Sequence, residues 1–100
     1  MLSLIPSQAN PALFCLAGAL AYDTAKSSVQ LGQQALKGEQ AAVVFDCQSV
    51  TRIDTAGIAV LLAWLRYAKA QQCALSFQHL PNQAQALLKS SGLIALIPLA

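Results

Sequence analysis

Few residues in this sequence could carry out covalent chemistry. A single histidine, His79, accompanies three widely spaced cysteines, Cys15, Cys47 and Cys73. His79 falls in an expected strand and has no recognisable nucleophile or G-x-S-x-G turn to serve. A zinc site would need about four closely arranged ligands, which this set does not supply. We therefore expect no catalytic residue and no metal site, and we expect reduced, buried thiols typical of a cytoplasmic protein.

Nucleotide-binding motifs are also missing. The sequence contains neither the phosphate loop G-x-x-x-x-G-K-[ST] nor the dinucleotide fingerprint G-x-G-x-x-G. We expect no bound cofactor, and any ATP connected with the function is hydrolysed by a partner.

The start of one helix is the best candidate for a site. Asp54 and Thr55 open the most strongly helical segment, residues 55–72, and their short side-chain oxygens can cap its free N–H groups. A phosphate on Thr55 would lie beside unpaired N–H groups and the positive end of the helix dipole. Two interpretations stay open: Thr55 caps the helix, which is worth about 1 kcal/mol, or it contacts a partner and accepts a phosphate. Two interpretations are also open for Arg52 and Asp54: they form a solvated ion pair, or they frame the contact with the partner. Gly57 is either a simple helix irregularity or a position whose missing side chain lets another backbone approach the start of the helix.

The same helix has two apolar stripes. One should pack on a sheet and consists of Ile58, Leu61, Leu62 and Leu65. The other lies more than a quarter-turn away and consists of Val60, Trp64 and Tyr67. This second stripe lies under another element or binds a partner, and we favour the partner because large amphipathic aromatic residues often anchor interfaces.

Periodicity places the remaining elements. Strands are expected at residues 2–5, 12–17, 41–47 and 74–80, and helices at 24–36, 55–72 and 82–90, followed by an apolar tail at 93–99. Gly18 should end the second strand, and Gly38 should cap the first helix. The unbroken apolar run at 41–47 indicates a central strand buried on both faces. Alternation of strands and helices requires mostly parallel strands, with an antiparallel N-terminal end.

Composition and charge bound the function. One hundred residues with 56% hydrophobic and 10% charged side chains fit a single domain spanning 1–100 with apolar surface left for a partner. The net charge of +2 comes from scattered residues, which argues against nucleic acid. The apolar run at 12–22 has no preceding Lys or Arg, so we expect no signal peptide. Residues 55–65 are too few to span a bilayer.

One segment resembles the centre of a STAS domain. It spans residues 44–62 and reads VFDCQSVTRIDTAGIAVLL in one-letter code. The shared pattern is an apolar strand, an Asp, a short loop, and Asp-Ser/Thr-x-Gly opening an apolar helix. Ser91-Gly92-Leu93 resembles the C-terminal loop of the family. In the N-terminal part, Gly18-Ala19-Leu20 lacks the acidic residue that often follows the glycine in the family. The resemblance implies an α/β domain whose mixed sheet of four to five strands carries helices mainly on one face.

The resemblance also implies a function. The short length and the Thr of the motif look most like the small cytoplasmic STAS subunits of ABC-type phospholipid transporters, which maintain outer-membrane lipid asymmetry. Such a subunit is not an enzyme, binds the transporter ATPase and lies at the inner membrane only through that complex. The alternative is an anti-sigma factor antagonist that binds an anti-sigma kinase and is regulated by phosphorylation of Thr55. The expected partner-binding residues are Thr55, Arg52, Asp54, Gly57, Val60, Trp64 and Tyr67.

Overall fold

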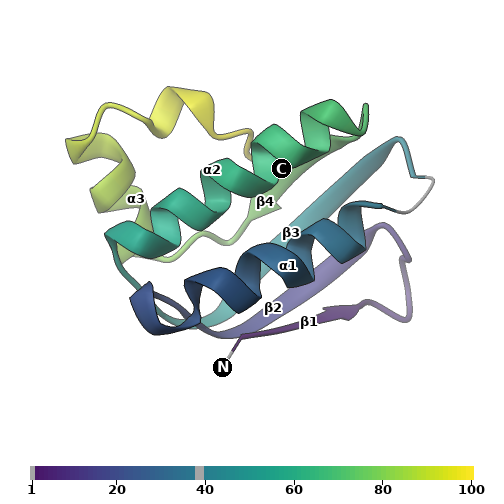
Figure 1. The fold of residues 1–100 in the computed structure, drawn as a ribbon, viewed down its shortest axis with the longest axis horizontal. Helices are drawn as coiled ribbons and strands as arrows, with labels where there is room; N and C mark the ends of the chain where they lie inside the picture. The colour runs from purple at the N-terminus through teal and green to yellow at the C-terminus, as the bar shows by residue number, and fades with distance from the viewer. Residues whose placement is uncertain (1, 38–39) are drawn as a thin grey trace.

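A four-stranded sheet forms one layer of the molecule. The computed structural model describes residues 2–37 and 40–100. The strands follow one another across the sheet in the order β1 (Ser3–Pro6), β2 (Leu13–Leu20), β3 (Ala42–Ile53) and β4 (Ala74–Gln78) (Figure 1). The first pair is antiparallel and the other two pairs are parallel. This confirms the expected mixed sheet with its antiparallel N-terminal end.

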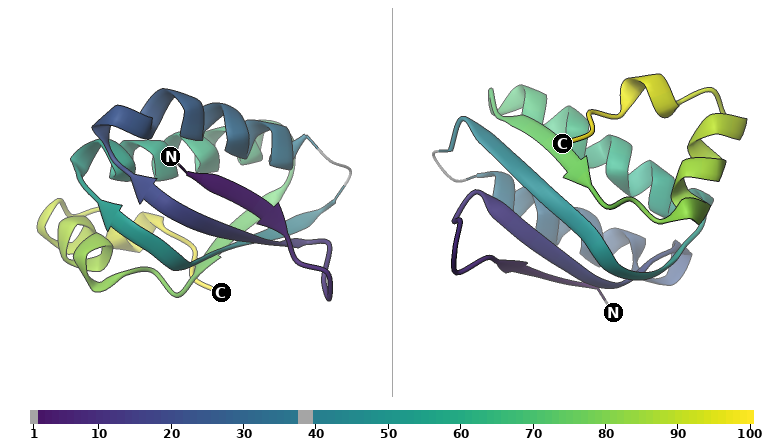
Figure 2. Two further views of the ribbon diagram at one scale, coloured as in Figure 1. Left: turned by 90° about the horizontal axis from the view of Figure 1, so that it is seen from below. Right: turned by 180° about the vertical axis from the view of Figure 1, so that it is seen from behind.

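The helices form the second layer. Two of them, α1 (Ala25–Leu36) and α2 (Thr55–Ala70), lie side by side on one face of the sheet, and α3 (Asn82–Ser90) lies beside α2 (Figure 2). Short 3-10 turns occur at Tyr22–Thr24 and Ile94–Leu96. Within residues 2–37 and 40–100, no helix covers the opposite face of the sheet. The expected packing of helices mainly on one face is therefore confirmed.

Two strands are longer than the sequence pattern predicts. β2 continues through Gly18, whose φ of 112° and neighbouring register shift let the strand reach Leu20. β3 continues to Ile53, so Arg52 belongs to a strand rather than to a loop. Polar residues could extend β3 because this part of the strand is largely exposed and keeps its hydrogen bonds to β2. The cap predicted at Gly38 lies outside the described residues.

The prediction that β3 is buried on both faces is wrong. Val43, Phe45 and Cys47 are buried against the helices, whereas the alternating Val44 and Asp46 are half-buried. The reason is the one-sided helical layer, which leaves the other face of the sheet uncovered by helices in the described part of the chain.

Aromatic rings form the centre of the core between the two layers. Phe45 makes edge-to-face contacts with Phe14, Trp64 and Phe77 at centroid distances of 5.9, 5.2 and 6.1 Å. Phe77 on β4 also pairs through its backbone with the C-terminal residues, which cover part of that edge. None of the helices in the described ranges is long and apolar enough to cross a membrane.

Candidate partner-binding site

Asp54 holds the start of α2 in place. Its carboxylate accepts hydrogen bonds from the backbone N–H of Gly57 at 3.0 Å and from that of Tyr22 at 3.1 Å. These N–H groups lower the pKa of the Asp54 carboxyl. Asp54 is therefore the N-cap residue, as expected from its position, and it also joins α2 to the turn before α1.

Thr55 does not cap the helix. It is exposed at the first position of α2, and its hydroxyl makes no hydrogen bond to any residue in the described ranges. Of the two interpretations of Thr55, the helix-cap interpretation is wrong, because the carboxylate of Asp54 fills that position. The hydroxyl is left available to a partner or to a modifying enzyme.

Gly57 is buried rather than available to a partner. A Cβ at this position would overlap the carbonyl oxygen of Leu20 at the end of β2. Another backbone does approach the start of α2, as the sequence suggested, but that backbone belongs to this chain. The prediction that Gly57 contacts a partner is therefore wrong.

Arg52 forms an ion pair with Asp23 rather than with Asp54. The guanidinium of Arg52 and the carboxylate of Asp23 are 3.0 Å apart, and both side chains are more than half exposed. An exposed pair of this kind contributes little to stability, on the order of 0–1 kcal/mol. Arg52 thus remains accessible at the edge of the site, beside the start of α2.

The second apolar stripe of α2 faces α1. Trp64 is fully buried, and its indole N–H donates a 3.0 Å hydrogen bond to the backbone carbonyl of Ser28 on α1. A Cβ at Gly32 would overlap this indole ring. Val60 is also buried, and Tyr67 is half-buried against the core.

The partner contact predicted for Trp64 is consequently wrong. Val60 is 2% exposed and belongs mainly to the core, although it also lines an open groove between α2 and α1. Helical periodicity showed correctly that α2 has two apolar sides. It could not show that α1 lies next to α2 on the sheet and covers the second side. Of this stripe, only Tyr67 keeps part of its surface exposed.

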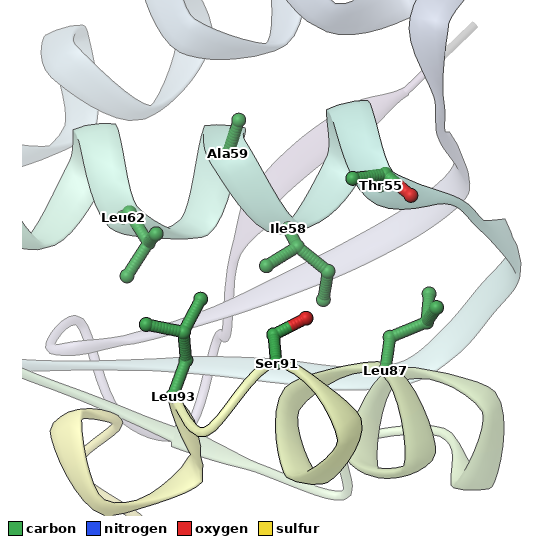
Figure 3. Close-up of a pocket in the computed structure, with 7 residues that line it drawn as sticks. All are labelled: Thr55, Ile58, Ala59, Leu62, Leu87, Ser91 and Leu93. Carbon is green, nitrogen blue, oxygen red and sulfur yellow. The ribbon is translucent and has the colours of Figure 1, made fainter.

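Two hollows flank the exposed surface of α2. A cavity of about 180 Å³ lies between α2, α3 and the turn after α3 (Figure 3). It is lined by Thr55, Ile58, Ala59, Leu62, Leu87, Ser91 and Leu93. An open groove of about 590 Å³ lies on the other side, toward α1. It is lined by Tyr22, Ala25, Lys26, Val29, Ala56, Ala59, Val60 and Ala63.

A line of small and apolar side chains separates the two hollows. We call it the α2 ridge and define it as Thr55, Ala56, Ala59, Leu62 and Ala63. Ala59 borders both hollows and is exposed. The outer face of the first half of α2 is therefore apolar although solvent reaches it. This is the property of a binding surface rather than of an ordinary helix exterior.

Several residues of this site were missed from the sequence. Tyr22 is 84% exposed beside the groove, and Leu87 and Leu93 close the cavity from α3 and the turn that follows it. The signal was present in α2 itself, where Ala56, Ala59 and Ala63 occupy positions at which a solvent-facing helix normally carries charge.

The histidine lies away from this site, and among the described residues its ring contacts a carboxylate and no Ser, Thr or Cys side chain. His79 follows β4 with a φ of 56°, and its Nδ1 lies 3.0 Å from a carboxylate oxygen of Asp46. Burial raises the pKa of Asp46, but hydrogen bonds from the Gln48 N–H and from His79 outweigh it and leave the pKa lowered. Within the described residues, no three His, Cys, Asp or Glu side chains come together as metal ligands.

The chain matches a known protein family over most of its length. A family model described as "Mlab, STAS domain" matches residues 5–98. The chain belongs to the STAS-domain family. These domains are generally non-enzymatic and act in regulation and protein–protein interaction. No curated protein sequence matches the chain significantly.

Solved structures share the STAS fold at low sequence identity. A putative anti-sigma factor antagonist from Thermotoga maritima has a TM-score of 0.76 at 12% identity, covering 99% of this chain and 85% of that chain. The phosphorylated form of the Bacillus cell fate determinant SpoIIAA has a TM-score of 0.67 at 14% identity, covering 100% and 91%. A sulfate transporter family protein from Wolinella succinogenes gives 0.66 at 13% identity, covering 84% and 68%. Identities this low support the fold alone.

Proposed function

We propose that this STAS domain is the small accessory subunit of an ABC-type phospholipid transporter and that it binds the transporter ATPase through the start of α2. The observation that carries the proposal is the exposed Thr55 hydroxyl on the α2 ridge between two apolar hollows. The subunit performs no catalysis and needs no cofactor. It lies in the cytoplasm, peripheral to the inner membrane through its complex, and serves the maintenance of outer-membrane lipid asymmetry.

The family description supports this proposal over other STAS roles. The matching model carries the MlaB name and extends over residues 5–98, most of the chain. The contact itself is supported by the rigid start of α2, where the Asp54 carboxylate holds two backbone N–H groups and Gly57 packs on Leu20. A partner therefore meets Thr55 on a preorganised surface, which reduces the conformational entropy lost on binding. Arg52 and Tyr67 contribute at its margins.

The alternative function is that of an anti-sigma factor antagonist. It is favoured by the similarity to SpoIIAA in both its unphosphorylated and phosphorylated forms. In this chain the corresponding step would be phosphorylation of the exposed Thr55 by an anti-sigma kinase. A phosphate there would be compatible with the positive end of the α2 dipole.

One experiment separates the two functions. The full chain is mixed separately with the purified transporter ATPase and with the anti-sigma kinase encoded in the same genome, each with and without ATP. The proposal expects a stable complex with the ATPase and an unchanged mass of the chain after incubation with the kinase and ATP. A gain of about 80 Da on Thr55, together with no complex with the ATPase, would support the alternative instead.

A further inference from the structure

Three cationic side chains lie around the α2 ridge, away from the Asp54 carboxylate at its start. Lys26 lines the groove toward α1 and is exposed. Arg66 lies one helical turn after Leu62 and Ala63 on α2, so it continues the line of the ridge. Lys69 lies three residues after Arg66 on the same helix. All three cations are exposed. The apolar ridge thus has a cationic side chain on its α1 flank and two more beyond its far end.

None of the described acidic residues forms an ion pair with Lys26, Arg66 or Lys69. Asp46 is bonded to His79, away from the helical layer. Asp23 is paired with Arg52, and both oxygens of Asp54 accept backbone N–H groups. An apolar ridge with a cationic rim is complementary to a surface that is apolar at its centre and acidic at its margins.

The shape of the surface selects a helix as the occupant. A ridge with a hollow on each side is the surface against which a second helix packs, because its side chains enter the hollows on either side of the ridge. The cavity of about 180 Å³ is open on one side, and its largest lining side chains are Ile58, Leu62, Leu87 and Leu93. An apolar cavity of about 150 Å³ is known to hold a benzene molecule, so this one has room for a single Leu- or Phe-sized side chain.

A second copy of this chain cannot supply the acidic helix. None of α1, α2 and α3 contains an Asp or a Glu. A bilayer is a poorer fit as well, because a membrane surface has no fixed side chain to fill a recess. The occupant must therefore come from a different protein.

Building on the proposed function, we infer that the α2 ridge binds an acidic amphipathic helix of the ATPase. One large apolar side chain of that helix enters the cavity between α2 and α3, and its Asp or Glu carboxylates lie opposite Lys26 and Arg66. Thr55 lies beside the same cavity.

Charge reversal with a matched control tests the acidic character of the helix. Arg66→Glu and Lys26→Glu are compared with Lys37→Glu, which makes the same change in net charge at the C-terminal end of α1, about 16 Å along the helix from Lys26. The dissociation constant for the purified ATPase is measured with the full chain at two salt concentrations. We expect each ridge variant to bind about tenfold more weakly, Lys37→Glu to bind like the wild type, and the wild-type affinity to fall with salt.

Filling the hollows tests the anchor. Ala59→Trp places a large side chain between the two hollows from an exposed position, and Ala70→Trp makes the same change at the exposed last residue of α2. Only Ala59→Trp should weaken binding, by about tenfold or more, while both variants keep the wild-type melting temperature.

Three results would overturn the inference. A wild-type chain that does not bind the ATPase would overturn it together with the proposed function. If the wild type binds the ATPase but Arg66→Glu and Lys26→Glu have the same dissociation constant as Lys37→Glu, the inference of an acidic helix is overturned and the proposed function is not. Unchanged ATPase affinity combined with loss of binding to vesicles of anionic phospholipid in the Arg66→Glu variant would assign the ridge to a membrane instead.

Discussion

Gly32 and Trp64 form a packing pair whose energy can be measured. A Cβ at Gly32 on α1 would overlap the buried indole of Trp64 on α2. In an unobstructed helix interior, Gly→Ala stabilises by about 1 kcal/mol. Here the added methyl must displace the indole, and overpacking of this kind costs about 1–3 kcal/mol. We therefore expect Gly32→Ala to lower the free energy of unfolding by about 1 kcal/mol.

Removing the indole should reverse the sign of that effect. Trp64→Ala should itself cost about 3–5 kcal/mol, because it empties a fully buried site and removes the contact with Phe45 and the hydrogen bond to Ser28. In that background the methyl of Gly32→Ala meets empty space, so the substitution should stabilise by up to about 1 kcal/mol. The expected coupling between the two positions is about 2 kcal/mol, which a double-mutant cycle resolves.

Urea unfolding of the four proteins, followed by circular dichroism, provides the measurement. Gln30→Ala, at an exposed position of α1, serves as the control and should change the free energy of unfolding by less than about 0.5 kcal/mol. If Gly32→Ala stabilises the wild type and the Trp64→Ala variant equally, the indole does not pack on Gly32 and the burial of Trp64 under α1 is refuted.

Three further predictions concern the supports of the site and the thiols. Gly57→Ala should destabilise by about 2 kcal/mol in urea unfolding, because its Cβ meets the Leu20 carbonyl, and a neutral result would contradict that contact. The pKa of Asp54 is lowered in the fold, so its stabilising effect is present at neutral pH and is lost as the pH falls through that lowered pKa. Melting temperatures measured from neutral pH down to about pH 2 should fall less for Asp54→Asn than for the wild type, and parallel curves would contradict this. Burial raises the pKa of the Cys47 thiol to about 12, so iodoacetamide at pH 8 should label exposed Cys15 and spare Cys47 until urea unfolds the chain, as read by mass spectrometry.

The sequence predicts the elements of this fold better than their ends. Residues 82–90 are a helix as expected, and the expected order of strands and helices is confirmed. The ends of β2 and β3 were misplaced because Gly18 and the polar residues before Ile53 read as breaks. Pairing with a neighbouring strand overrides such local signals, and that pairing is a tertiary property.

The site shows the same division between local and tertiary information. The cap at Asp54 is a local feature and could be predicted from its position before α2. The burial of Trp64 depends on α1, and the burial of Gly57 depends on Leu20, both distant in sequence. Side-chain type made Trp64 look like an interface anchor, whereas small residues such as Ala59 form the exposed surface.

Thr55→Glu tests most directly whether the exposed start of α2 contacts the transporter ATPase. Thr51→Glu is the control, because Thr51 is exposed on β3 and lines neither hollow. An acidic group at Thr55 is favourable for the helix dipole within the free domain, so any loss of affinity must arise at the contact.

The measurement is the dissociation constant of each full-length variant for the purified ATPase, together with the melting temperature of the variant alone. We predict that Thr55→Glu binds about tenfold or more weakly with an unchanged melting temperature, and that Thr51→Glu binds like the wild type. Equal dissociation constants for the wild type and both variants would contradict this contact.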